Sequence, residues 1–454
     1  MLQKRSEPIP EFELKEISLS KLKQYIKKLK GNRSSGIDQI DSFSLKLASP
    51  LLEEVLLHLI NLSIKNRRYS KEWKTQLIHP YFKKGDKHDG ANYRPVSNII
   101  EVSKIVEHAV FEQITEHFQA NSLLHPNHHG FVANHNTTSA LIQIYDLWLQ
   151  AAEDKKISAT LLLDLSAAFD MIDHGILLKK LHHYNFEEST IRFFESYLSD
   201  RKQIVKVGSK LNKPQAVGSH SVPQGSILGP LLFIIYMNDF PDNSDDGEDV
   251  LYADDTTEVI SDKDPEALEN RLQQKANDST QWIRDNCMLC SGDKTKLLIA
   301  CTRDKKQKLK ELNKTFTVEV CGKVIEESSD EKLLGIVMSG NMLWTTHLYG
   351  NNKTGKEKIQ GLIPQLSQRV GVLTQLSRLM TKVQLKSVGS GIFSSKLLSG
   401  LPLFSNVWGI LDMDDSNLRY AAYTKMMPGE CKCYRTKCFV YYAALTETLP
   451  QQNF

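Results

Sequence analysis

The sequence predicts an α+β fold in which helices accompany an antiparallel sheet, on two observations. Residues 157–163 form an apolar run that ends in Asp164, as expected for a buried strand. Further along, two alternating stretches flank Tyr252-Ala253-Asp254-Asp255, which predicts a β-hairpin with two adjacent carboxylates at its tip. Strands and amphipathic helices alternate from residue 157 to residue 300, which favours one mixed sheet.

If the two strands are neighbours in one sheet, Asp164, Asp254 and Asp255 converge. Three carboxylates at one point repel each other unless divalent cations neutralise them. The usual chemistry of such a site is phosphoryl transfer with two Mg²⁺ ions about 4 Å apart, and Mn²⁺ is an alternative metal. A solvated turn is the other interpretation of an Asp-Asp pair, and it must also account for the second strand that ends in aspartate.

Charge is distributed unevenly along the 454 residues. The net charge is only +3, but residues 1–100 and 301–400 each carry +8, whereas residues 101–300 carry −13. Basic flanks around an acidic centre suit a protein that holds a polyanion and uses metal ions in the middle; drift of surface charge is the alternative. The longest apolar run, residues 227–237, contains Gly-Pro and is too short to cross a bilayer, so we expect a soluble protein without a membrane partner.

The seven cysteines have no framework spacing, which indicates a reduced, intracellular protein, in the nucleus, the cytoplasm or both. Two cysteine groups are candidate halves of a zinc site, although no histidine near the C-terminus completes the pattern. These groups are Cys287 with Cys290, and Cys431 and Cys433 with Cys438.

Apolar periodicity predicts helices near residues 18–30, 50–67, 100–119 and 353–400. The first helix leads into the loop 31–38, where backbone N–H groups and Arg33 are candidate phosphate contacts. Residues 78–86 are predicted to be a strand that enters a basic turn, and the return strand starts at Tyr93. Residues 242–249 are expected to form an exposed acidic loop.

Further motifs accompany the aspartates. Phe169 follows the first carboxylate by five residues, where its ring could lie under the sugar of a nucleotide and clash with a 2′-OH; a plain core aromatic is the alternative. Gly225, after Gln224, allows the backbone to approach a ligand closely. Lys294 is a candidate proton donor to a leaving pyrophosphate, with a solvated lysine as the alternative. Residues 332–336 predict another short hairpin.

The order and spacing of these motifs resemble the reverse transcriptases of non-LTR (LINE-type, jockey-like) retrotransposons. The resemblance runs from about residue 20 to about residue 410, and each motif alone is weak whereas the ordered set is specific. The motifs are Phe82-Lys83-Lys84-Gly85-Asp86, Asn92-Tyr93-Arg94-Pro95-Val96-Ser97, His129-Gly130-Phe131, Asp164-Leu165-Ser166-Ala167-Ala168-Phe169-Asp170, Pro223-Gln224-Gly225-Ser226, Tyr252-Ala253-Asp254-Asp255, Lys294 and Leu334-Gly335.

The resemblance implies a right-hand polymerase fold, with fingers, a palm that contains an antiparallel sheet, and a helical thumb. It divides the chain into an N-terminal helical extension of the fingers (1–60), a reverse transcriptase domain (61–340), a helical thumb (341–410) and a tail of unknown role (411–454).

The resemblance also implies a role for each matching residue. Asp164 and Asp254 would bind the two metal ions with Asp255 beside them, and Lys294 would be the general acid. The nucleotide contacts would be Lys83 or Lys84 and Arg94 on the triphosphate, Phe169 as the steric gate that favours dNTPs, and Gln224 and Gly225 lining the nucleotide and template pocket.

Two departures from the family pattern matter. Members usually carry Gln before Gly130-Phe131 and Arg after it, where this chain has His129 and Val132.

The cluster of His125, His128, His129 and His135 is a candidate metal site, with loop histidines as the favoured interpretation. Complete elements also carry an endonuclease ahead of the polymerase, and the first residues here do not supply one, so we expect a polymerase region without the endonuclease.

The leading hypothesis is an RNA-directed DNA polymerase whose partners are an RNA template, a DNA primer and dNTPs. A truncated, catalytically silent copy that only binds nucleic acid is the second hypothesis. An RNA-directed RNA polymerase is a third, which Phe169 and Ala253 disfavour.

Overall fold

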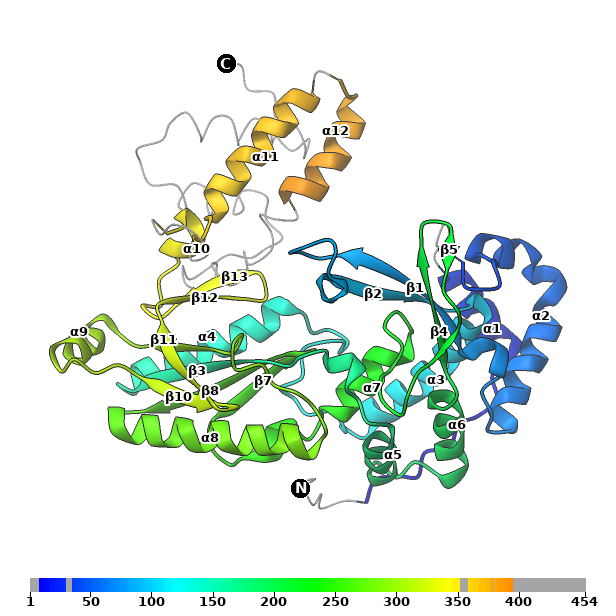
Figure 1. Ribbon diagram of the computed structural model, residues 1–454, viewed down its shortest axis with the longest axis horizontal. Helices are drawn as coiled ribbons and strands as arrows, with labels where there is room; N and C mark the ends of the chain where they lie inside the picture. The colour runs from blue at the N-terminus through cyan, green and yellow to red at the C-terminus, as the bar shows by residue number, and fades with distance from the viewer. Residues whose placement is uncertain (1–7, 30–34, 352–357, 378, 395–454) are drawn as a thin grey trace.

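The computed structural model describes residues 8–29, 35–351, 358–377 and 379–394. Within them, a helical N-terminal region with its own sheet leads into a larger central sheet, and a hairpin and a helical region follow (Figure 1). The α+β class predicted from the sequence is confirmed, since two main sheets and many helices share one chain.

The N-terminal region is built on three helices: α1 (Leu19–Lys28), α2 (Ser42–Lys65) and α3 (Glu101–Ala120). Ser18 and Asp41 cap the first two helices, each accepting a hydrogen bond from a backbone N–H in the first turn. The second helix begins before residue 50, contrary to the prediction. Pro50 lies inside α2 and does not start it.

The N-terminal sheet has the order β2-β1-β4-β5, and β6 also pairs with β4. Its strands are β1 (Thr75–Phe82), β2 (Tyr93–Asn98), β4 (Lys202–Val207), β5 (Lys210–Leu211) and β6 (Gln215–Ala216). Strands β1 and β2 form an antiparallel hairpin with Tyr81 opposite Arg94. The predicted strand, basic turn and return strand are confirmed.

The central sheet has the order β10-β11-β9-β3-β8-β7. Its strands are β3 (Ile157–Asp164), β7 (Glu248–Tyr252), β8 (Asp255–Asp262), β9 (Lys296–Ala300), β10 (Thr317–Val320) and β11 (Lys323–Ser328). Strand β3 pairs antiparallel with both β8 and β9, so it lies inside the sheet, as its apolar sequence predicts.

Different helices cover the two faces of the central sheet (Figure 1). Helix α8 (Pro265–Asp285) packs against one face, where Leu161 and Leu272 belong to the main core. Helix α4 (Thr137–Glu153) covers the other face, and its Trp148 Nε1 donates to Thr160 Oγ1 at 2.8 Å. Because side chains alternate along a strand, Asp164 lies on the same face as Thr160.

Three helices join the two sheets: α5 (His174–His183), α6 (Glu188–Leu198) and α7 (Leu228–Tyr236). Every side chain of α7 except that of Pro230 is buried, which confirms the buried helix expected after Pro223-Gln224-Gly225-Ser226. Charged α9 (Arg303–Glu311) follows β9.

After the central sheet come the hairpin β12 (Asp330–Leu333) and β13 (Ile336–Ser339), then α10 (Thr345–Tyr349), α11 (Leu362–Leu376) and α12 (Lys382–Gly389). Side chains of the β12–β13 hairpin pack with those of α4 in one apolar cluster. Side chains of α10 and α11 form a second apolar cluster. Trp344 packs against both clusters and lies 5.2 Å from Tyr145 of α4, measured between ring centroids. The hairpin and helices predicted here are confirmed up to residue 394; residues 395–454 lie outside the described residues.

The acidic stretch 242–249 is not simply an exposed loop. Part of it forms a 3-10 turn (Phe240–Asn243), and β7 starts at Glu248. Asp249 is buried and binds Lys275 of α8 at 2.9 Å, and Asp246 pairs with Arg271. The prediction failed because these carboxylates have basic partners on a helix that follows them in sequence.

Candidate active site

Three carboxylates lie at one end of the central sheet. Asp164 closes β3 and is the register partner of Asp255, the first residue of β8. Asp254 lies in the turn between β7 and β8, where Ala253 has φ 56°. Cross-strand partners have neighbouring side chains on one face of the sheet. The structure therefore brings together the three aspartates that the sequence singled out.

The electrostatics of this cluster are those of crowded negative charge. Burial raises the pKa of Asp255 to about 6, and the neighbouring carboxylates Asp254 and Asp164 add to the increase. Lys294 supplies the nearest positive charge, because its Nζ lies 3.1 Å from Asp164 Oδ2. Both side chains of this pair reach solvent, so the pair adds little to stability.

The donor set fits hard divalent cations such as Mg²⁺ or Mn²⁺, since all three side chains offer carboxylate oxygens. Asp255 is the register partner of Asp164 and follows Asp254 in sequence, so their negative charges are close, and a cation would relieve the repulsion. However, no group of three or more His, Cys, Asp or Glu side chains in the described part of the chain is already arranged to hold an ion.

The segment Ser291–Thr295 wraps around the end of β3. The backbone N–H of Ser291 donates to the carbonyl oxygen of Asp164 at 2.9 Å, and Thr295 Oγ1 donates to the carbonyl oxygen of Ser291 at 2.8 Å. Gly292 packs closely on the β10–β11 turn, where an added Cβ would lie 2.9 Å from the carbonyl oxygen of Val320. These contacts fix the backbone that carries Lys294.

Gly130 packs against the turn between β7 and β8 that carries Asp254, a role that sequence reasoning missed. The backbone N–H of His129 donates to the carbonyl oxygen of Leu251 at 2.7 Å, so this segment runs along β7. An added Cβ on Gly130 would lie 2.1 Å from the backbone nitrogen of Ala253. Only glycine fits this contact. The motif His129-Gly130-Phe131 was the available signal, but it does not say what the glycine touches.

Phe169 is half-buried between two other rings. Its ring stacks on Phe233 of α7, with centroids 4.5 Å apart and planes at 15°. The ring of Phe131 is perpendicular to it, with the centroids 6.2 Å apart. The packing interpretation of Phe169 is confirmed, because one ring face packs against the core. The side chain is also partly exposed, and its role as a gate stays a prediction.

Gln224 and Gly225 join three segments of the chain. Gln224 Nε2 lies 3.0 Å from each carboxylate oxygen of Asp170. The backbone carbonyl oxygen of Gln224 accepts a hydrogen bond from the backbone N–H of Ser97 at 3.0 Å. Gly225 has φ 108°, and an added Cβ would lie 2.4 Å from the carbonyl oxygen of Ser97. The loop is thus held between β2 and the segment that carries Phe169.

A buried acid holds the start of α7, and a buried arginine lies near that acid; no pattern in the sequence predicts either. Glu107 Oε2 accepts from the backbone N–H groups of Ile227 and Leu228, at 2.6 and 3.3 Å, at the start of α7. Burial raises the Glu107 pKa, and the nearby Arg201 guanidinium opposes that increase. Arg201 is itself buried against the ring of Tyr197, 4.9 Å from its centroid.

The predicted phosphate-binding residues lie on the β1–β2 hairpin, which belongs to the N-terminal sheet. Arg94 lies on β2, and Lys83 and Lys84 follow the end of β1. All three are exposed, and within the described ranges none of them takes part in an ion pair. They are available to an anionic ligand.

The four histidines do not form a preformed group of three or more ligands in the described part of the chain. His129 is held by hydrogen bonds with Ser139 Oγ at 2.8 Å and Gln143 Oε1 at 2.6 Å. His128 is buried, which lowers its pKa to about 3. Cys287 and Cys290 are free thiols, and Cys431, Cys433 and Cys438 lie outside the described residues.

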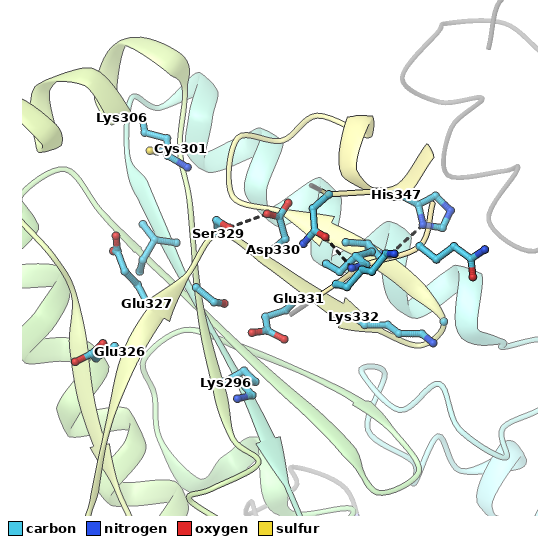
Figure 2. A pocket seen from close by; sticks show the side chains of 18 of the residues that line it. Lys296, Cys301, Lys306, Glu326, Glu327, Ser329, Asp330, Glu331, Lys332 and His347 are labelled. Carbon is cyan, nitrogen blue, oxygen red and sulfur yellow. Dashed lines mark hydrogen bonds between the residues drawn. The ribbon is translucent and has the colours of Figure 1, made fainter. Parts of the chain in front are cut away.

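A groove of about 1190 Å³ lies behind the β12–β13 hairpin, between β11, α9 and the start of the C-terminal helices. Figure 2 shows lysines and carboxylates facing each other across it. Asp330 accepts hydrogen bonds from Ser329 at 2.7 Å and Ser339 at 2.5 Å, and the backbone N–H of Val337 donates to His347 Nδ1 at 3.2 Å. The mixed charge gives the groove no single-sign field that would select a small ion.

Comparison with known proteins agrees with the motif order. A family profile described as reverse transcriptase (RNA-dependent DNA polymerase) matches residues 83–337. The matched span holds the β1–β2 hairpin lysines, the three aspartates, Lys294 and the turn at Leu334-Gly335.

Several curated relatives come from Drosophila melanogaster. The chain is 27% identical over 359 residues to a probable RNA-directed DNA polymerase from transposon BS, and 27% identical over 356 residues to the RNA-directed DNA polymerase from mobile element jockey. These alignments cover 77% and 76% of the chain but 38% of each relative. A probable RNA-directed DNA polymerase from transposon X-element is 28% identical, over 61% of the chain and 30% of the relative. The predicted resemblance is confirmed.

Proposed function

This chain belongs to the reverse transcriptase (RNA-dependent DNA polymerase) family, and on that premise we propose that it is the RNA-directed DNA polymerase of a non-LTR retrotransposon. Its substrates would be an RNA template, a DNA primer and dNTPs, inside the nucleus, the cytoplasm or both. The observation that carries the proposal is the register of Asp164 with Asp255 beside Asp254 and Lys294.

We assign the parts of a right-hand polymerase to the observed elements. The β1–β2 hairpin and its helices would be the fingers, the central sheet the palm, and α10 to α12 the thumb. The β12–β13 hairpin would support the primer, because it packs over the sheet face that carries Asp164. A duplex held this way would be contacted through its shape and its phosphates, so binding should weaken with salt.

In the proposed reaction, the primer 3′-oxygen forms a bond to the α-phosphorus of a dNTP, and the bond from that phosphorus to pyrophosphate breaks. Bound Mg²⁺ or Mn²⁺ would favour ionisation of the 3′-OH and neutralise charge on the phosphates. Asp164, Asp254 and Asp255 would hold those cations. Lys294, whose Nζ lies 3.1 Å from Asp164 Oδ2, would give a proton to the leaving pyrophosphate, and the proton of the 3′-OH would pass to water.

The remaining residues would bind and orient the nucleotide. Lys83, Lys84 and Arg94 would contact the triphosphate, which their exposure and their freedom from ion pairs among the described residues allow. The Phe169 ring, fixed by its stacking on Phe233, would exclude a 2′-OH. Gln224 and Gly225 would line the pocket for the base pair, because the loop that carries them is anchored to Asp170 and Ser97. Catalysis would be mainly positioning and charge stabilisation.

One observation favours a second candidate, a silent copy that only binds nucleic acid. Lys294 pairs with Asp164, and no three-ligand site is preformed in the part of the chain that the structure describes. A chain that cannot release this lysine would keep its basic surfaces and still lack catalysis.

Extension of a DNA primer on poly-rA, with dTTP and Mg²⁺, tests the proposal. We expect extension by the wild-type chain and its loss in Asp254→Ala, with binding of the primed template unchanged within about threefold, since salt-dependent phosphate contacts dominate affinity. A folded wild-type chain that binds the primed template without extending the primer would favour the silent copy.

A further inference from the structure

Helix α2 presents a row of large apolar side chains to solvent. Phe43, Leu47, Leu51, Val55 and Leu59 follow one another at intervals of four residues, with exposed fractions of 61%, 74%, 89%, 56% and 42%. Single exposed apolar residues are ordinary, whereas a continuous row on one helix marks an interaction site. Figure 1 shows α2 at the outer edge of the N-terminal region, far from the central sheet.

The opposite side of α2 is fixed to the protein, so the row cannot simply turn inward. Leu56, Ile60 and Ile64 are buried in the main core. The amide of Asn61 exchanges two hydrogen bonds with the backbone of Ile17, at 2.8 and 3.0 Å, and Glu53 pairs with Lys23 of α1 at 2.9 Å. The orientation of the helix is therefore set by contacts on its buried side.

Among the described residues, α2 is the one helix that is long and apolar enough to cross a membrane, judged by length and composition alone. Crossing a bilayer would break its contacts with α1 and α3 and would expose the core they cover. A partner that covers only the outward face of α2 fits better than a membrane.

The row has the symmetry that pairing with a second copy requires. It reads the same in both directions about Leu51, because apolar residues occupy the positions four and eight residues to either side. In an antiparallel pair, Leu51 would meet the second copy's Leu51, Leu47 would meet Val55, and Phe43 would meet Leu59. Contact along the whole row requires a shallow crossing angle of about +20°, the class in which rows spaced by three residues pack with rows spaced by four. A two-fold interface is self-complementary in this way.

The polar residues near the row are compatible with the same pairing. Glu54 and His58 lie on the same face as the row, and they would lie opposite Ala48 and Ser44 of the second copy, two small residues. Glu53 would lie opposite Ser49 and points toward Lys23 on its own chain. No pair of like charges is brought together.

The exposed surface is also large enough. With Leu52 and Leu62, which are 38% and 41% exposed, the seven residues offer roughly 800 Å², taking about 200 Å² for a fully exposed large apolar residue. A stable interface buries about 800 Å² on each partner.

We propose that two copies of this chain associate through α2, with the two-fold axis passing near Leu51. Figure 1 shows α2 at the outer edge of the N-terminal region, away from the central sheet whose strands carry Asp164 and Asp255. This dimer is independent of the polymerase proposal, because no residue of the row belongs to the candidate active site.

Sedimentation of the full chain over a range of micromolar concentrations tests the dimer. We expect a monomer–dimer equilibrium whose dissociation constant rises at least about thirtyfold in Leu51→Glu, since that change places two carboxylates at the centre of the interface. Leu312→Glu is the matched control, because Leu312 is 71% exposed on a different helix end, and it should leave the equilibrium unchanged. Far-ultraviolet circular dichroism and Tm would show that both variants are folded.

Cross-linking locates the axis. Leu51→Cys should form an intermolecular disulfide under mild oxidation by a disulfide reagent such as oxidised glutathione, in clear excess over both the wild-type chain and Leu312→Cys. A wild-type chain that stays monomeric at all concentrations would overturn the proposal, and so would a dimer that Leu51→Glu leaves intact. Co-flotation of monomer with phosphatidylcholine vesicles, lost in Leu51→Glu, would overturn it in favour of a membrane.

Discussion

Gln224 Nε2 lies 3.0 Å from both carboxylate oxygens of Asp170, so one amide joins the loop before α7 to the segment that carries Phe169. Burial raises the Asp170 pKa, and the hydrogen bond from Gln224 opposes that increase. The two residues are 54 positions apart in sequence, yet this contact holds their two motifs together.

Asp170→Ala should weaken nucleotide binding because it frees Gln224. We expect KM for dNTP to rise about three- to tenfold with a smaller change in kcat, the loss of one partly exposed, charge-assisted hydrogen bond. Steady-state primer extension at varied dNTP concentration measures this. Asp170→Asn keeps one acceptor oxygen and should lie between the alanine variant and the wild type. An equal loss of kcat in both variants would instead place Asp170 in the chemical step.

Gly130→Ala should remove activity without unfolding the chain. Its Cβ would lie 2.1 Å from the backbone nitrogen of Ala253, so the turn that carries Asp254 must shift. We expect kcat to fall at least about tenfold, because a displacement of about 1 Å at a catalytic group has effects of that size or larger. Gly90→Ala, where an added Cβ meets nothing within 4 Å, is the matched control and should retain full extension. Normal activity in Gly130→Ala would show that the turn relaxes freely.

The role of Gly130 illustrates which features a sequence can predict. Asp164 and the Asp254-Asp255 pair were predictable because each ends or starts a strand with a clear apolar pattern, and strands of one sheet bring such ends together. Gly130 was visible only as part of a motif. Its contact with Ala253 joins segments more than a hundred residues apart, and no local pattern encodes that distance.

Buried polar residues show the same limit. Asp249 lies in an acidic stretch that reads as solvent-exposed, and its partner Lys275 follows on α8. Glu107 lies within a helix whose apolar stripe was predicted correctly, but its bonds to Ile227 and Leu228 depend on tertiary packing. Apolar periodicity predicts which face of an element is buried, and it does not predict which polar groups are buried with it.

Phe169→Val should admit ribonucleotides. Removing the ring takes away the surface expected to clash with a 2′-OH, while Val keeps a branched side chain against Phe233. Primer extension with rNTP and dNTP in parallel should show the ratio of their kcat/KM values rising at least about tenfold. Phe131→Val changes the neighbouring exposed ring and serves as the control. If sugar selectivity is the same in Phe169→Val and wild type, Phe169 is a packing residue and not a gate.

Glu258→Gln should change how stability depends on pH. Burial raises the pKa of Glu258 to about 8, and neighbouring Asp249, whose own pKa is raised to about 6, adds to the increase. In the folded chain Glu258 thus binds its proton more tightly than an ordinary glutamate. The stability linked to that proton is fully present below about pH 4.5 and is lost as pH rises toward 8, by at most about 1.4 kcal/mol per pH unit.

The glutamine variant carries no ionisable proton at this position, so its Tm should fall less between pH 5 and pH 8 than that of the wild type. Thermal unfolding at a series of pH values, with exposed Glu311→Gln as the control, measures the difference. Parallel profiles for wild type and Glu258→Gln would mean that Glu258 is already ionised in the folded state.

The effects of replacing Glu107 and Arg201 on the free energy of unfolding should not be additive. Glu107→Ala removes the acceptor for two backbone N–H groups at the start of α7 and leaves the buried Arg201 without its nearest negative charge. We expect the free energy of unfolding to fall by about 3–5 kcal/mol. The double variant Glu107→Leu with Arg201→Leu should cost less than the sum of the two single leucine variants, because it removes both charges together. Denaturant unfolding of the four proteins gives the coupling energy. Additive losses would mean that each residue stabilises the α7 loop through its own hydrogen bonds alone.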